Sequence, residues 1–179
     1  MSAEDELYEK GKSELRLSER ILAELPGFRG YKEKELRRES DKLLRNHLYR
    51  RLMNARSDLK EAFQKLSDYR RYEVLTDMDR LLARFDRIAE NINHASYGYA
   101  GFFNIVKIEE EDLDRMISFD HQLLEYVNNL VEEASKFKAD ILDLKFSEAK
   151  THIVRVSKAL ESLDKKFSER TEAILGVKN

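Results

Sequence analysis

The chain has 179 residues, of which 41% are hydrophobic and 38% are charged, and its formal net charge is −2. This length fits one domain over residues 1–179, and the near balance of charge gives no global field that would attract a polyanion. The absence of cysteine excludes disulfides, thiolate metal sites and cysteine nucleophiles.

The acidic residues near the N-terminus lack the basic and apolar pattern of a signal peptide, and no apolar run reaches the length of a membrane span, about 18 residues. We therefore expect a soluble, cytoplasmic protein. The high content of Glu, Lys and Arg without Cys is also typical of proteins from thermophiles.

Apolar residues recur at steps of three and four along nearly the whole chain, which is the period of a helix. The pattern predicts helices over residues 7–25, 31–66, 75–95, 109–144 and 146–174. A Pro/Gly break at residues 25–31 and an aromatic connector at residues 96–108 separate some of them. The sequence therefore predicts an all-α fold, an antiparallel bundle of about four to five long helices with coiled-coil-like spacing.

Two helix boundaries carry no helix breaker. No Gly or Pro lies between the second and third helices, and we expect a turn within residues 67–76, with one continuous helix as the alternative. The boundary at residues 144–146 likewise lacks Gly and Pro.

Motifs for catalysis or metal binding are absent from the sequence. None of the four histidines follows a Glu by three residues, the spacing that di-iron bundles use. The pairs Glu90/His94 and Glu148/His152 are four residues apart, a spacing that arises often by chance on charged helices. Nucleotide-binding glycine motifs, a nucleophile elbow and a zincin motif are also absent. We predict no cofactor, no metal and no catalytic residue.

Asp120 is a charged residue within an apolar stripe, between Met116 and Leu123. An Asp near a core must be paired or hydrogen-bonded, because an isolated buried charge is very costly. The position of Asp120 therefore predicts either a polar tie between helices or a polar pocket. The residues expected around it are His121, His47, Arg51 or a Tyr hydroxyl.

A basic block covers the predicted helix at residues 32–51. Residues 28–51 carry nine Lys or Arg and four Asp or Glu, whereas residues 109–143 carry three and eleven. On an ideal helix, a cationic stripe combines Lys34, Arg38, Lys42 and Arg45. This stripe could bind nucleic acid or an anionic lipid surface. Interleaved acidic residues also fit a solvated, ion-paired face.

The aromatic connector holds four aromatics and two glycines within seven residues. Its aromatic residues are Tyr97, Tyr99, Phe102 and Phe103. They predict either a plug that closes one end of the bundle or a loop that docks a partner.

Two segments carry a family resemblance. Residues 26–38 read PGFRGYKEKELRR, and residues 97–103 read YGYAGFF. Together they resemble a family of uncharacterised archaeal and bacterial all-helical proteins that share a PGxxGYKxKELRR opening and a YGYAGxF connector. The resemblance implies no activity and no binding residues, but it favours these two segments as the place of function.

The sequence thus favours a non-catalytic helical adaptor or assembly scaffold that acts through protein–protein contacts or self-association. One alternative is a polyanion binder that uses the basic helix at residues 32–51. The other is a small enzyme or ligand-binding bundle with a polar pocket around Asp120.

Overall fold

The structure is a computed structural model that describes residues 17, 19–28, 34–95 and 110–175. Within these ranges, side chains are described except those of residues 34–38, 110–113 and 174–175. The long helices are α2 (Lys34–Asp68), α3 (Tyr72–His94), α4 (Glu110–Leu142) and α5 (Ala149–Leu175), and a short 3-10 helix η3 (Phe146–Glu148) precedes α5. These described residues form no strand, so the prediction of an all-α bundle is confirmed.

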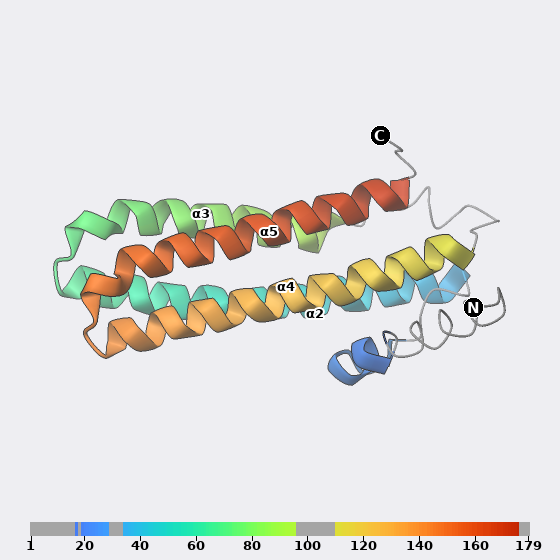
Figure 1. Cartoon of the computed structure of the whole chain (residues 1–179), viewed down its shortest axis with the longest axis horizontal. Coiled ribbons are helices and arrows are strands. Elements are labelled where there is room, and N and C mark those ends of the chain that lie inside the picture. The colour runs from blue at the N-terminus through green and yellow to red at the C-terminus, as the bar shows by residue number, and fades with distance from the viewer. Residues whose placement is uncertain (1–16, 18, 29–33, 96–109, 176–179) are drawn as a thin grey trace, which may run out of the picture.

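The bundle consists of two antiparallel hairpins that lie side by side (Figure 1). The first hairpin is α2–α3 and the second is α4–α5. Because α2 packs along α4 and α3 packs along α5, neighbouring helices of different hairpins run in the same direction. We call the end that holds the α2–α3 and α4–α5 turns the turn end. The opposite end, where α2 and α4 begin and α3 and α5 end, is the network end.

Helix α2 shows why the bundle closes. One side of the helix is fully buried, and its residues follow one another at steps of three or four, the spacing of helices that pack knobs into holes. These buried residues are Leu44, Leu48, Leu52, Ala55, Leu59, Ala62 and Leu66. Burial of each Leu side chain contributes about 1.5–3 kcal/mol, so apolar packing along the length of the bundle is the main source of stability.

The second and third predicted helices are separate. Helix α2 ends at Asp68 and α3 begins at Tyr72, so the expected turn within residues 67–76 is present and the continuous helix is not.

The predicted Pro/Gly break ends the first helical segment. Residues 19–24 are helical, and the chain turns at Pro26 and Gly27. Gly27 has φ +95°, in the left-handed region that favours glycine, and a Cβ at this position would lie 3.6 Å from Leu43 Cδ2. The turn therefore needs glycine for its backbone conformation rather than for space.

The N-terminal segment, residues 19–28, packs on the side of the bundle formed by α2 and α4. Its helix is the blue element below these helices in Figure 1. The Asn128 amide of α4 donates to both carboxylate oxygens of Glu24 at 3.2 Å. Three apolar side chains of the segment are buried: Ile21, Leu25 and Phe28.

Candidate functional site

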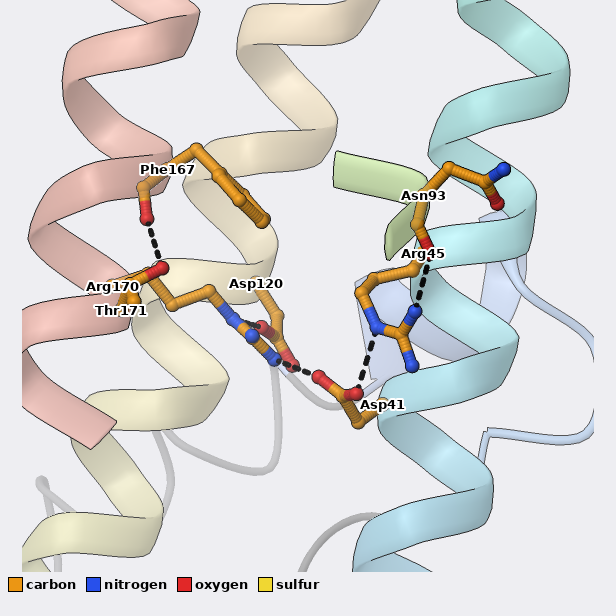
Figure 2. A network of polar contacts seen from close by, with 7 residues as sticks. All are labelled: Asp41, Arg45, Asn93, Asp120, Phe167, Arg170 and Thr171. Atoms are coloured by element: carbon orange, nitrogen blue, oxygen red, sulfur yellow. Dashed lines mark hydrogen bonds and ion pairs between the residues drawn. The ribbon is translucent and has the colours of Figure 1, made fainter. Parts of the chain in front are cut away.

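A buried network of charged side chains lies at the network end (Figure 2). Asp120 of α4 and Arg170 of α5 are both 0% exposed. Arg170 donates from Nε to Asp120 Oδ1 at 2.6 Å and from Nη2 to Asp41 Oδ1 at 3.0 Å. One guanidinium therefore joins carboxylates from two different helices.

The network continues from Asp41 to the last turn of α3. Asp41 and Arg45, one turn apart on α2, are both buried. Arg45 donates from Nε to Asp41 Oδ2 at 2.9 Å and from Nη1 to the carbonyl oxygen of Asn93 at 2.8 Å. A cation at the carbonyl end of a helix is favourable, because the helix dipole and the unpaired carbonyls there are negative.

The two carboxylates and two guanidiniums balance in charge and connect all four long helices in one layer. Each charge lies beside an opposite charge, so the large cost of desolvation is offset by pairing. Removing one member would leave a buried charge without its counterion. This geometry is that of a polar tie between the four helices.

The same spacing that creates the apolar core places these charges inside. Asp120 lies four residues after Met116 and seven before Val127, and Arg170 lies three residues after Phe167. Arg45 lies seven residues before Leu52 and points to the same side of α2. The charged residues thus continue the buried stripes of their helices toward the network end.

The structure places Asp120 in the core, as its spacing suggests, but its partner Arg170 lies outside the residues that the sequence predicts. Of the predicted neighbours, His121 is half-buried and its Nδ1 lies 3.7 Å from Glu125 Oε2 on the same helix. His47 and Arg51 lie half-buried on α2.

His47 lies half-buried on α2, and Glu24 of the N-terminal segment is near enough to affect its pKa. Its Nε2 atom is buried and has no hydrogen-bond partner among the described residues. Burial lowers the pKa of His47 below its ordinary value of 6.5, and the nearby Arg51 and Arg50 lower it further, while Glu24 opposes them. The imidazole is therefore held in its neutral form.

Two residues of the predicted cationic stripe on α2, Lys42 and Arg45, do not share one solvent-facing side. Lys42 is exposed, but Arg45 is buried in the network and is not on a solvent-facing stripe. This corrects the expectation that Arg45 faces the solvent. Lys34 and Arg38 belong to α2, and their side chains lie outside the described part. The aromatic connector with Tyr97, Tyr99, Phe102 and Phe103 also lies outside the described residues.

Of the two histidine–carboxylate pairs that the sequence suggests, Glu90/His94 is formed, whereas His152 contacts Asp140. His94 Nε2 lies 3.0 Å from Glu90 Oε2 on the exposed face of α3, while His152 pairs with Asp140 at 2.9 Å. Within the ranges that the structure describes, no group of three or more His, Asp or Glu side chains is arranged to hold a metal ion.

The turn end is built from two equivalent turns. In the first, Arg70 N–H donates to Ser67 O and Arg71 N–H donates to Leu66 O, both at 2.9 Å. In the second turn, the N–H of Leu144 donates to Ile141 O at 3.1 Å, and the N–H of Lys145 donates to Asp140 O at 2.9 Å. This pair of bonds is the Schellman motif, which needs a left-handed residue after the helix.

Both left-handed residues lack the usual glycine. Arg70 has φ 56° and Leu144 has φ 65°. A left-handed conformation costs a residue with a Cβ roughly 1–2 kcal/mol. These turns therefore carry large side chains at positions where glycine would relieve strain.

Large apolar side chains are exposed on these same turns. Tyr72 is 66% exposed, Leu144 is 49%, Tyr69 is 47% and Leu142 is 45%. The other strongly exposed large hydrophobic side chains of the described ranges are Leu22, in the N-terminal segment, and Val154, within α5. Four of these six residues thus gather at one end of the bundle, and grouped apolar exposure is typical of an interaction surface.

Contacts between the two turns hold this surface in place. The rings of Tyr69 and Phe146 have centroids 5.0 Å apart, and the Arg71 guanidinium lies 4.7 Å from the centroid of the Phe146 ring. Asp140 binds Lys145 Nζ at 2.7 Å as well as His152, and these hydrogen bonds lower the pKa of Asp140. The turn end is therefore a fixed arrangement of apolar groups.

Comparisons with known proteins found no similar protein. No protein-family model, no curated protein and no solved structure matches the chain.

Proposed function

We propose that the protein is a non-catalytic helical scaffold that binds another protein through its turn end. The single observation that carries this proposal is the concentration of exposed large apolar side chains on the two turns. Tyr72, Tyr69, Leu142 and Leu144 are each more than 40% exposed, although most large hydrophobic side chains in the described ranges are buried.

The chemistry of this surface fits a protein partner. Tyrosine is enriched at binding hot spots, because it provides a large apolar contact and a polar hydroxyl with few rotatable bonds. The contacts of Phe146 with Tyr69 and Arg71 order the turns before binding. Less conformational entropy is then lost on association, which favours affinity.

The buried network supports the same reading from the other end. Asp120, Arg170, Asp41 and Arg45 are engaged with one another in a neutral set. Such a set stabilises one arrangement of helices, and its charges are directed at each other rather than at the surface. A bundle fixed in this way would be a rigid support for the turn end.

A membrane surface is a less well supported partner than a protein. No described helix combines the length with the apolar character that a membrane span requires. The turn end also carries Asp143 and Glu148 together with its basic residues, so it lacks the uniform positive charge that anionic lipids attract.

Site-specific photo-crosslinking would test the proposed function. A photoreactive residue would replace Tyr72 in one variant and Leu22 in a matched control, because both positions are apolar and exposed but only Tyr72 belongs to the turn end. We expect a defined protein adduct from position 72 that disappears when Tyr69→Ser and Leu144→Ser are added. Equal adducts from both positions, or none from position 72, would contradict the proposal.

A further inference from the structure

We infer that the partner of the turn end is the turn end of a second copy of this chain. The inference rests on the proposed function and specifies its partner. It follows from the opposite charge of the two turns and from their position side by side.

The two turns differ in sign. Residues 65–73 carry three basic and two acidic side chains (3 − 2 = +1), whereas residues 140–150 carry two basic and three acidic ones (2 − 3 = −1). Arg70 is exposed and forms no ion pair within the described part of the chain. Asp143 is exposed on the other turn, and its ion pair within the described residues is one of 3.6 Å with Lys145, which also binds Asp140 at 2.7 Å. Each turn therefore presents an exposed charge that the other could neutralise.

A two-fold axis would bring opposite turns together. In a two-fold dimer, if one residue of the first copy contacts another residue of the second, the reciprocal contact also forms. The two turns are in contact through Tyr69 and Phe146. A two-fold axis that passes between the turns, perpendicular to the long axis of the bundle, would therefore place the α2–α3 turn of one copy on the α4–α5 turn of the other. Arg70 would then face Asp143 twice, and the exposed tyrosines would face the exposed leucines.

The charges distinguish this arrangement from the other symmetric one. An axis that placed like turns together would bring Arg70 onto Arg70 and Asp143 onto Asp143. Like charges across an interface are unfavourable and suppress the wrong pairing. The pattern therefore selects the dimer in which α2–α3 of one copy meets α4–α5 of the other.

The expected dimer is weak. Helices in a bundle lie about 10 Å apart, so the end of four helices offers an area on the order of 400 Å² per copy. Stable interfaces bury about 800 Å² per partner, and smaller ones belong to weak or transient contacts. The product would be an elongated particle with both network ends pointing outward.

Sedimentation velocity of the purified full chain over a range of concentrations tests the inference. The variants are Arg70→Glu, Asp143→Arg, the combination of both in one chain, and an equimolar mixture of the two single variants. We expect the parent to dimerise reversibly and each single variant to lose about tenfold or more in affinity, since the reversed pair occurs twice. The combined variant and the mixture should both recover dimerisation. Circular dichroism checks that each variant is folded.

Several outcomes would overturn the inference. A parent that stays monomeric, single variants that dimerise as the parent does, or a mixture that fails to recover would each exclude this dimer. Crosslinking from position 72 separates this failure from failure of the proposed function. An adduct with a different protein that depends on Tyr69 and Leu144 would leave the proposed function intact, whereas a purified chain that crosslinks to itself supports both.

Discussion

The two ends of the bundle depart from a simple apolar core in opposite ways. At the network end, charged side chains are buried, and Arg170 is 0% exposed between Asp120 and Asp41. At the turn end, apolar side chains are exposed, and Tyr72 is 66% exposed. Buried charges must be paired to be tolerated, and exposed apolar groups contribute little to folding. The first end joins the four helices through paired buried charges, and the second is the surface to which the proposed function assigns binding.

The largest effect is expected from breaking the network. Asp120→Ala leaves the Arg170 guanidinium buried without one of its carboxylates, and the loss of one partner of a buried ion pair costs about 3–5 kcal/mol. Chemical denaturation of the purified variant measures this loss. A variant within about 0.5 kcal/mol of the parent would contradict the role of the network.

A double-mutant cycle sharpens this prediction. Arg170→Met alone should also be strongly destabilising, because it strands Asp120. The combined variant Asp120→Ala/Arg170→Met removes both charges and leaves Asp41 paired with Arg45 at 2.9 Å. We expect it to lose less stability than the sum of the two single variants, since residues in one network are coupled. Additive losses would show that Asp120 and Arg170 contribute to stability independently of each other.

At the turn end, replacement by glycine should be stabilising. Leu144→Gly relieves the left-handed strain at φ 65°, and we expect a gain of up to about 1 kcal/mol, because part of the relief is offset by the greater freedom of glycine in the unfolded chain. The matched control is Gly27→Ala at φ +95°, which should lose about 1 kcal/mol. Thermal unfolding of both variants measures the two shifts. A loss for Leu144→Gly would show that its side chain is needed for folding.

The smallest effect is expected from His47, at the side of the network end where the N-terminal segment packs. Its pKa is lowered in the folded protein, so the unfolded chain binds this proton more readily. The stabilisation is therefore present above the unfolded value of 6.5 and is lost as the pH falls through 6.5 toward the folded pKa. His47→Gln should lose less stability than the parent as the pH falls below 6.5, because glutamine takes up no proton. An NMR titration with a His47 pKa above 6.5 would contradict this sign.

The sequence was sufficient for the helices and for the burial of Asp120. Steps of three and four residues predict both, because the helical period fixes which residues share a face. The turn at residues 69–71 could be placed only broadly, because Arg70 adopts the left-handed conformation that glycine would have signalled. The same holds for Leu144 in the second turn.

The partners in the network could not be predicted in the same way. Arg170 is 50 residues from Asp120 and 129 from Asp41, so their contact depends on how four helices are aligned in the bundle. The expectation that Arg45 faces the solvent groups it by charge with the other cations of the stripe, although an ideal helix also places it within about 20° of Leu52, which is buried. Its position seven residues before Leu52 was the signal for burial.

The most direct test of the division between the two ends is the stability of a turn-end variant measured beside its self-association. Tyr72→Ser/Leu144→Ser removes two exposed apolar side chains, and Leu22→Ser is the control at similar exposure outside the turn end. We expect the free energy of unfolding of the turn-end variant to stay within about 0.5–1 kcal/mol of the parent, as for surface substitutions, while its association is lost and that of the control is retained. A loss of about 3 kcal/mol or more, comparable to breaking a buried ion pair, would show that these side chains belong to the folding core and would contradict the account.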